Sequence, residues 1–511
     1  MKPSLPALLL ALATPFLGAC GSAAPPEPER PRLVMLVATC SVNRSFLSPY
    51  AEEIPYTPQL QRFADEGVVF ERHRTESGQS GTSFASIFSG RQAYGHGVYC
   101  HPKALDPSLY LVGEAFADAG FETWFWNGHP MGSIELAYGQ GIPPERSFNV
   151  RSKRAKHTML REGDRRFTGL LDGLVSDPEK HAFVLANFTV THSPYPKQIS
   201  TQEVLDFIQR WPARGQGLGR ADLERWFRVY DENRFELQWD YGPTVERLHL
   251  SADDQLALQR VLQVTYEAMV ERLDRGFGEM LAAIEARGLL EDALIVLTAD
   301  HGELLYRVNA LFQWTHGLQL ADEVLDVPWI VRGPGLAPGR HAEVTRSIDV
   351  FPTLAGLVGL EIAPELRPEG EDLSRVLRGE AEAPRLLAYS HTTTIDPPQL
   401  EQFADYGTLL RWFPRTDPEL VWTAVRDRDE LFLLRPYEGF EFEPAAFDLA
   451  TDPERRKDIF DPGNARHAEM HRKLERYKGF LVEAYGKSSA QAVGDAAARA
   501  ALEDLGYIGD D

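Results

Sequence analysis

The chain has 511 residues, of which 43% are hydrophobic and 25% charged, the composition of a globular protein with one large domain and a smaller one. Its formal net charge of −22 argues against nucleic acid as a partner, because phosphate backbones are bound by clustered lysine and arginine. Three cysteines are too few for a disulfide framework.

The first 20 residues have the pattern of an export signal. A basic start is followed by an apolar stretch at 5–16, too short to span a bilayer comfortably, and then by the sequence LGAC ending at Cys20. This sequence resembles the bacterial lipobox, which implies lipidation of Cys20 and an exported lipoprotein on the periplasmic or cell-surface side, anchored in the outer membrane. An ordinary signal peptide with an incidental cysteine is the alternative. Residues 21–31, rich in proline and glutamate, are expected to form a flexible tether.

Apolar strands and helical stretches alternate through residues 32–380. The expected strands are residues 32–39, 121–126, 182–190 and 293–299, and the expected helices are residues 57–67, 108–119 and 253–287. This order predicts an α/β domain with a mostly parallel central sheet and helices on both faces. In such sheets, ligands bind beyond the carboxyl ends of the strands.

Two regions break this alternation. Residues 197–250 are rich in aromatic and charged side chains without a clean period, so we expect an insertion near the pocket. Further on, short strand-like pieces such as 420–425 and 430–434 predict a smaller C-terminal α+β subdomain over 381–485, followed by a tail at 486–511.

One candidate metal segment follows the strand at 293–299. Asp300 and His301 lie directly after it, and Gly302 permits a tight turn, so these side chains suit a divalent cation. Taken alone, an Asp-His-Gly sequence also occurs by chance, and its histidine then serves as an ordinary turn residue.

The other candidate residues suit an anionic group. Ser80 and Thr82 stand at the expected start of a short helix, where free N–H groups and the helix dipole favour an anion, although serines there also serve simply as caps. His192 lies just past the strand at 182–190, and His316 precedes a further expected strand at 327–331.

In this order, the segments resemble the motifs of the sulfatases of the alkaline-phosphatase superfamily. The matching segments are ADHGE at 299–303 (D-[HN]-G-E), HSPY at 192–195 (H-x-P-Y), HGLQLADE at 316–323 (H-G-x-x-L-Y-D-E) and SGR to HGV at 89–98 (T-G-R-Y-P-x-R-H-G-V). Further similar motifs at 347–354, 447–454 and 502–508 extend the resemblance over residues 32–508.

The resemblance implies an alkaline-phosphatase-like fold and hydrolysis of sulfate or phosphate esters of a small molecule or glycan. It implies that Asp300 and His301 bind one divalent metal ion, with calcium expected. It also implies that His192 and His316 contact the ester, and that Arg91 and His96 order the site.

The nucleophile motif departs from the family pattern C/S-x-P-S-R. Ser80 aligns with the first residue, but Thr82 replaces the proline and Phe84 the arginine that the modifying enzymes recognise. Conversion of Ser80 to formylglycine is therefore not expected. An unmodified Ser80, or Thr82 if the register slips, is the candidate nucleophile.

The metal motif also departs from the pattern. Cys40 and Ser41 stand where family members carry metal-binding aspartates after the first strand, which leaves a weak set for calcium or magnesium. A softer ion such as zinc could use the Cys40 thiolate. Alternatively, Cys40 is a small buried residue or pairs with Cys100, and both alternatives stay open.

Three functions remain after these departures. The first is a hydrolase of weak or full activity; the second is a degenerate family member that binds sulfated or phosphorylated glycans; the third is a transferase of a phosphate-containing headgroup. Contact with the membrane is expected through the lipid anchor only.

Overall fold

The computed structural model describes residues 30–99, 103–150, 160–308, 310, 312–317, 319–392, 421–436, 442–453 and 455–487. Cys20, the expected lipidation site, lies outside the described residues, as do Cys100, the possible disulfide partner of Cys40, and the motif at 502–508. The chain divides into two units, residues 1–30 and residues 31–511. The following description concerns this larger unit.

Eight strands form the main sheet, in the order β4-β3-β5-β1-β6-β7-β2-β8. All neighbours pair in parallel except β7, which is antiparallel to β6 and β2. The predicted mostly parallel sheet is therefore confirmed. The strand bounds are β1 Leu33–Thr39, β2 Val68–Arg74, β3 Glu122–Asn127, β4 Ser147–Asn149, β5 Ala182–Phe188, β6 Ala293–Ala299, β7 Trp329–Arg332 and β8 Gly339–Arg346.

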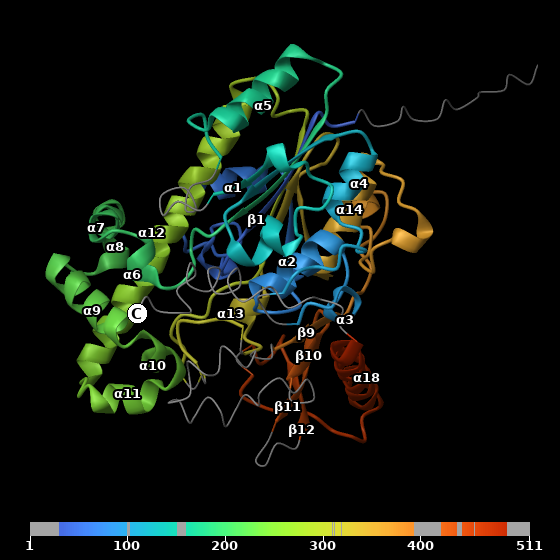
Figure 1. Cartoon of the computed structure of the whole chain (residues 1–511). Helices are drawn as coiled ribbons and strands as arrows, with labels where there is room; N and C mark the ends of the chain where they lie inside the picture. Colours follow the sequence, from blue (N-terminus) through green and yellow to red (C-terminus); the bar gives the residue numbers. More distant parts are fainter. Residues whose placement is uncertain are drawn as a thin grey trace, which may run out of the picture. The chain divides into compact units, whose positions relative to one another are not determined.

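Helices cover both faces of this sheet (Figure 1). Because successive side chains of a strand point to opposite faces, Leu33, Met35 and Val37 of β1 join one core and Val34 and Leu36 the other. The first core packs against α1 (Pro58–Asp65), α5 (Arg165–Ser176) and α12 (Ala252–Glu285); the second packs against α2 (Ser80–Ser89), α4 (Val112–Asp118) and α14 (Val350–Val358). Short helices α3 (Ala93–His96), α13 (Asp322–Leu325) and α15 (Ser374–Leu377) lie in the connections.

The region expected as an insertion is helical. It contains α6 (Tyr195–Gln198), α7 (Thr201–Arg210), α8 (Pro212–Gly215), α9 (Arg220–Glu232), α10 (Arg234–Trp239) and α11 (Tyr241–Arg247). Phe207 and Trp226 pack in the same core as Leu258 and Leu262 of α12. These helices have 4 to 13 residues each, too few turns for an apolar period to emerge over the whole segment.

A second, antiparallel sheet has the order β12-β11-β10-β9. Its strands are β9 Ala388–His391, β10 Thr423–Arg426, β11 Glu430–Pro436 and β12 Phe442–Asp448. One face packs against α18 (Ala465–Lys487) through Met470 and Leu474, and the other contacts Leu325 of α13. Figure 1 shows this sheet and α18 beyond one end of the main sheet.

One expected helix begins later than predicted. Residues 106–110 form a turn in which Ser108 N–H and Oγ–H both donate to Asp106 Oδ1, and the helix starts only where Glu114 accepts a hydrogen bond from Leu111 N–H. Local side-chain bonds of this kind compete with helix formation, so α4 begins at Val112 rather than at Ser108.

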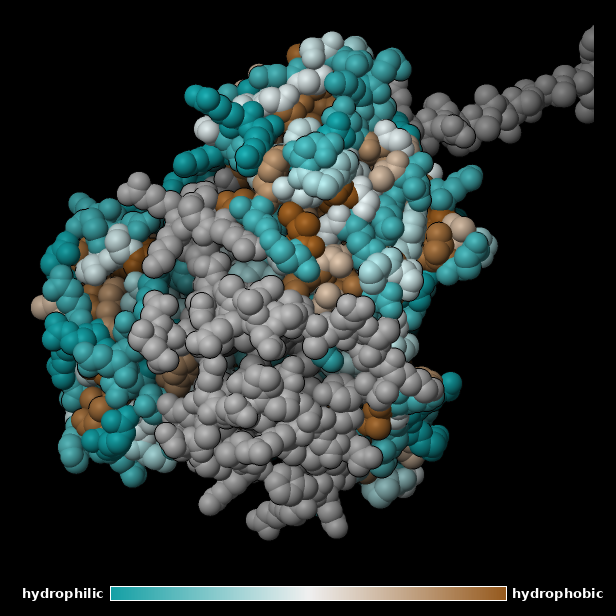
Figure 2. Space-filling view, in the orientation of Figure 1, coloured by the Kyte–Doolittle hydropathy of each residue, from teal (hydrophilic) through white to brown (hydrophobic). Residues whose placement is uncertain are grey.

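Hydrophilic side chains cover most of the coloured surface in Figure 2. In the described part of the chain, the large hydrophobic residues that are exposed are Val175 of α5, Leu256 of α12, Val308 and Phe480 of α18. Across the same residues, no helix has both the length and the apolar character needed to cross a membrane.

Candidate functional site

The carboxyl ends of three neighbouring strands meet the start of α2. β1 lies between β5 and β6, so the residues that follow these strands are brought side by side. They are Cys40 after β1, His192 after β5 and Asp300 with His301 after β6. Ser80 joins them as the first residue of α2, and His316 reaches them from the connection before α13. Six of the sequence-predicted site residues are therefore collected in one place.

Asp300 is fixed by backbone groups. Its Oδ1 atom accepts hydrogen bonds from Ser41 N–H (3.2 Å) and His301 N–H (2.6 Å). Ser41, which donates one of these bonds, adopts a φ of 58°, an uncommon conformation for a residue other than glycine. The Oδ2 atom is buried and has no hydrogen bond of normal geometry within the described chain, although Ser80 and Cys40 are close enough to stabilise its charge. Burial raises the pKa of Asp300.

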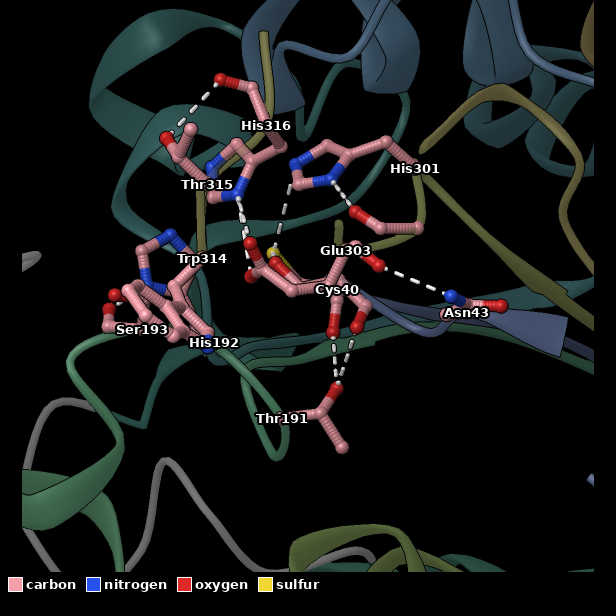
Figure 3. Close-up of polar contacts among 12 residues, drawn as sticks. Cys40, Asn43, Thr191, His192, Ser193, His301, Glu303, Trp314, Thr315 and His316 are labelled. Carbon is pink, nitrogen blue, oxygen red and sulfur yellow. Dashed lines mark hydrogen bonds and ion pairs between the residues drawn. The ribbon is translucent and has the colours of Figure 1, made fainter. Parts of the chain in front are cut away.

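His301 has a defined tautomer. Its Nδ1–H donates to the Gly302 carbonyl oxygen at 2.8 Å, so the Nε2 atom of the neutral ring carries a lone pair. This lone pair faces Cys40 Sγ at 4.0 Å, a contact marked in Figure 3. It also faces Ser80 Oγ at 3.0 Å. Gly302 is required here because a Cβ atom would lie 2.1 Å from the Glu323 carbonyl oxygen.

Ser80 occupies a position that favours negative charge. Gln79, the residue before it, makes no side-chain cap, so the N–H groups at the start of α2 are left without that partner. The helix dipole adds a partial positive charge at the same end. Ser80 Oγ also lies 3.7 Å from Cys40 Sγ.

His192, His301 and His316 form a cluster of imidazoles. The His316 ring stacks on that of His301 with 4.2 Å between centroids and meets the His192 ring edge-on at 5.1 Å. Burial lowers the pKa of His316 to about 3. Burial, together with the neighbouring His316 and His129, lowers that of His192 well below its usual value. The rings of His192 and His316 are therefore neutral in the absence of an anion.

Glu303 and His129 are site residues that the sequence did not single out. Glu303 Oε2 lies 3.3 Å from His316 Nδ1, and burial raises the pKa of this carboxyl well above its usual value. The His129 ring lies 6.0 Å from that of His192. A signal was present for His129, because it follows the expected strand at 121–126 as His192 follows its own strand.

Two groups of three residues have donor atoms close enough for a metal ion: Cys40, Asp300 and His301, and Cys40, His129 and His192. The second is poorly suited, because His129 Nδ1 accepts a hydrogen bond from Met131 N–H and its Nε2 then carries the proton. The first offers one sulfur, one nitrogen and one carboxylate. Calcium takes six to eight oxygen ligands, so this set does not fit the expected calcium ion.

Thr82, Arg91 and His96 lie apart from this centre. Thr82 Oγ1 is buried within α2 and has no hydrogen-bond partner among the residues described. Arg91 bonds to the Arg367 carbonyl oxygen and pairs with Glu369 at 3.7 Å. The roles expected for these three residues stay predictions.

His96 belongs to a buried polar network around Glu76. Its Nδ1 accepts from Val98 N–H, so its Nε2–H donates to Ser86 Oγ (3.1 Å), which donates to Glu76 Oε2 (2.8 Å). The Tyr477 hydroxyl of α18 donates to Glu76 Oε1 at 2.8 Å. The network thus connects the helix that begins with Ser80 to the C-terminal helix.

Two surface hollows of the described structure lie elsewhere. One, of about 450 Å³, is lined by residues such as Glu122 and Arg166, and the other, of about 640 Å³, by residues such as Asp427 and Arg466. Among the residues that line these two hollows there is no member of the group formed by Cys40, Ser80, His192, Asp300, His301 and His316.

Comparisons with known proteins agree with this geometry. A family model described as sulfatase matches residues 32–360. The chain is 25% identical to steryl-sulfatase of Mus musculus, over 92% of this chain and 85% of that protein. It is 20% identical to N-acetylglucosamine-6-O-sulfatase of Bacteroides thetaiotaomicron, over 93% and 90%.

Solved structures show the same fold. The structure of BT4656 in complex with its substrate D-glucosamine-2-N,6-O-disulfate superposes with a TM-score of 0.62 at 17% identity, covering 90% of this chain and 99% of that one. Phosphonate monoester hydrolase of Agrobacterium radiobacter superposes with a TM-score of 0.60 at 18% identity, covering 89% and 96%.

Proposed function

The chain belongs to the sulfatase family, and on this premise we propose that it hydrolyses sulfate or phosphate esters with the unmodified hydroxyl of Ser80 as nucleophile. One observation carries the proposal. Ser80 Oγ lies at the start of α2, where an anionic ester is attracted, and 3.0 Å from His301 Nε2, one of the donor atoms for the cation described below.

The neighbouring histidines would assist the reaction. An anionic ester bound among His192 and His316 would raise their pKa values, because a nearby negative charge favours the protonated ring. The protonated rings would then donate hydrogen bonds to the ester oxygens. Ser80 would release its hydroxyl proton to water, and its Oγ atom would form the bond to sulfur or phosphorus. The bond to the leaving oxygen would break, and that oxygen would take a proton from one of the two histidines. Water would hydrolyse the resulting Ser80 ester.

Asp300 and His301 would hold a divalent cation beside Ser80. Such an ion supplies positive charge that stabilises the oxygens of the ester. The chain's own contribution is to fix the donors, through the two N–H groups on Asp300 and the carbonyl oxygen of Gly302 on His301.

The proposed substrate is a sulfated or phosphorylated sugar or another small molecule. Two observations support it: BT4656 was solved with a sulfated glucosamine, and N-acetylglucosamine-6-O-sulfatase is a relative over nearly the whole chain. We also propose that Cys20 is lipidated and anchors the protein to the cell envelope. Incorporation of a labelled fatty acid, lost in Cys20→Ala, is the measurement.

Ser80→Ala tests the nucleophile. Hydrolysis of 4-nitrophenyl sulfate and 4-nitrophenyl phosphate by the full chain should fall by at least about 100-fold, because the attacking oxygen is gone. Ser89→Ala, the same change at the other end of α2, is the matched control and should retain most activity. Full activity in Ser80→Ala contradicts the proposal. An inactive wild-type chain that binds sulfated oligosaccharides in calorimetry would instead support a degenerate binding protein.

A further inference from the structure

We infer that Cys40, Asp300 and His301 form a binding site for a thiophilic divalent cation of the zinc class, in place of a calcium site. The inference rests on the proposed function for the location of the site. The test measures metal binding directly and needs no substrate. A failure of the metal site can therefore be distinguished from a failure of the proposed ester hydrolysis.

The donor set is the first argument. Cys40 supplies a thiol sulfur, His301 an imidazole nitrogen and Asp300 a carboxylate oxygen, and all three side chains are fully buried. Zinc binds four-coordinate to sulfur, nitrogen and carboxylate oxygen, and its catalytic sites use three protein ligands with a fourth position open. Hard cations such as calcium and magnesium need more oxygen donors than the single carboxylate present here.

The spacing of these donors is the second argument. Cys40 Sγ lies 4.0 Å from His301 Nε2, and Asp300 Oδ2 lies 3.5 Å from the same atom. With Zn–S and Zn–N bonds of about 2.3 and 2.0 Å, the edges of a tetrahedron are roughly 3.3 to 3.6 Å. The observed separations therefore need only a few tenths of an ångström of closure. Ser80 Oγ lies within 3.7 Å of Sγ and 3.0 Å of Nε2, in the place of the fourth donor.

The surrounding hydrogen bonds are the third argument. The lone pair on His301 Nε2 is available because the Gly302 carbonyl oxygen fixes the proton on Nδ1, the arrangement that metal-bound histidines commonly show. Ser41 N–H and His301 N–H occupy Asp300 Oδ1, which leaves Oδ2 to bind the ion. The lone pair that accepts the Ser80 hydrogen bond in this structure is the one that would coordinate the cation.

Cobalt binding to the full chain in detergent tests the site. Co²⁺ bound to a thiolate gives a charge-transfer band in the near ultraviolet, which needs no substrate and no turnover. The wild-type chain should develop this band with one Co²⁺ per chain, and one equivalent of Zn²⁺ should abolish it. A large excess of Ca²⁺ should leave it unchanged.

Variants assign the band to its ligand. Cys40→Ser should lose the band and bind Zn²⁺ at least about 10-fold more weakly, whereas Cys100→Ser, which removes a different thiol, should retain both. Cys40→Asp should lose the band and gain affinity for Ca²⁺, since it replaces a soft donor by a hard one. Circular dichroism and urea midpoints would check that each variant is folded.

Three results would overturn the inference: no cobalt band in the wild-type chain, a band that survives in folded Cys40→Ser, or displacement of Co²⁺ by Ca²⁺. If the cobalt results are as expected but Ser80→Ala keeps full esterase activity, the metal site is supported and the assignment of Ser80 as nucleophile is contradicted.

Discussion

Arg74 and Asp326 form a buried ion pair, with 2.6 Å between Nη1 and Oδ1 and an Arg74 side chain that is 1% exposed. Arg44 and Arg426 pair with the same carboxylate, each at 2.8 Å. Burial alone would raise the pKa of Asp326, but the charges of Arg426 and Arg44 hold it below its usual value. Because Arg74 ends β2 and Arg426 ends β10, one carboxylate connects the main sheet to the C-terminal sheet.

Asp326→Asn should lower the free energy of unfolding by about 3–5 kcal/mol, because it leaves buried guanidinium groups without this counter-charge. Urea unfolding followed by circular dichroism measures the loss. The control is Glu224→Gln at the exposed Arg220–Glu224 pair, where less than about 1 kcal/mol is expected. An equally small loss in Asp326→Asn would mean that Asp322 alone balances the arginines.

Asp274 predicts a pH-dependent stability. Its carboxylate accepts hydrogen bonds from Leu60 N–H (2.7 Å) and Gln59 N–H (3.2 Å) at the start of α1, and burial raises its pKa from 3.8 to about 7. The folded state therefore binds one more proton than the unfolded state between these values. The contribution of Asp274 to stability is complete below about pH 4 and is lost as the pH rises through 7.

Asp274→Asn removes this titration while keeping an acceptor oxygen. The stability of the wild type relative to the variant should fall by up to about 3 kcal/mol between pH 5 and pH 8. Urea midpoints of both proteins at the two pH values give the difference. Parallel pH profiles would show that the carboxyl of Asp274 is charged throughout this range.

Tyr477→Phe removes the hydroxyl that donates to Glu76. Burial raises the pKa of Glu76 to about 7, and the hydrogen bonds from Ala93 N–H, Tyr477 and Ser86 oppose this rise. Loss of one of these donors in a buried place should cost about 1–3 kcal/mol of unfolding free energy. Tyr241→Phe serves as the control, because its hydroxyl makes only longer contacts of 3.3–3.4 Å, and it should lose less than half as much.

Glu303 is expected to act as a neutral carboxylic acid, because burial raises its pKa well above the usual value. Glu303→Gln has nearly the same shape and can keep the hydrogen bond to His316, so its free energy of unfolding should change little. Glu303→Ala removes this bond and leaves a cavity, and its free energy of unfolding should fall by about 2–4 kcal/mol. Equal losses in both variants, measured by calorimetry, would show that the charged form is required.

The central strands of the main sheet were predictable from the sequence, whereas β2 and β8, the last two strands at one side of the sheet, were not. β1 and β6 are buried on both faces, so each appears as an uninterrupted apolar run, and the prediction for β6 matches its bounds. β2 and β8 lie at the other end of the sheet and are partly exposed. Their mixed sequences, such as VVFERHR in β2, have no comparable signal, because Glu71 and Arg72 are partly exposed and the charge of the buried Arg74 is balanced by ion pairs.

The site was predictable where strand ends and motif spacing agree. Asp300, His301 and His192 each follow a buried strand, and their meeting point follows from the order of strands in a parallel sheet. The pairing of Glu303 with His316 could not be predicted, because it depends on the path of an irregular connection that brings two residues 13 positions apart into contact. The family resemblance indicated a role for His96, but the hydrogen bonds that involve its ring come from the Glu76 network.

The contact between Glu76 and Tyr477 also bears on how the protein is made. A nascent chain that has reached residue 360 contains Cys40, Ser80, Asp300 and His301, and every position that the family model matches. It lacks the hydroxyl that completes the Glu76 network, which arrives 401 residues after its acceptor. Translation therefore has to pass residue 477 before Glu76, in the segment that leads into Ser80, gains this hydrogen bond, and a nonsense mutation far beyond the matched region would still remove it.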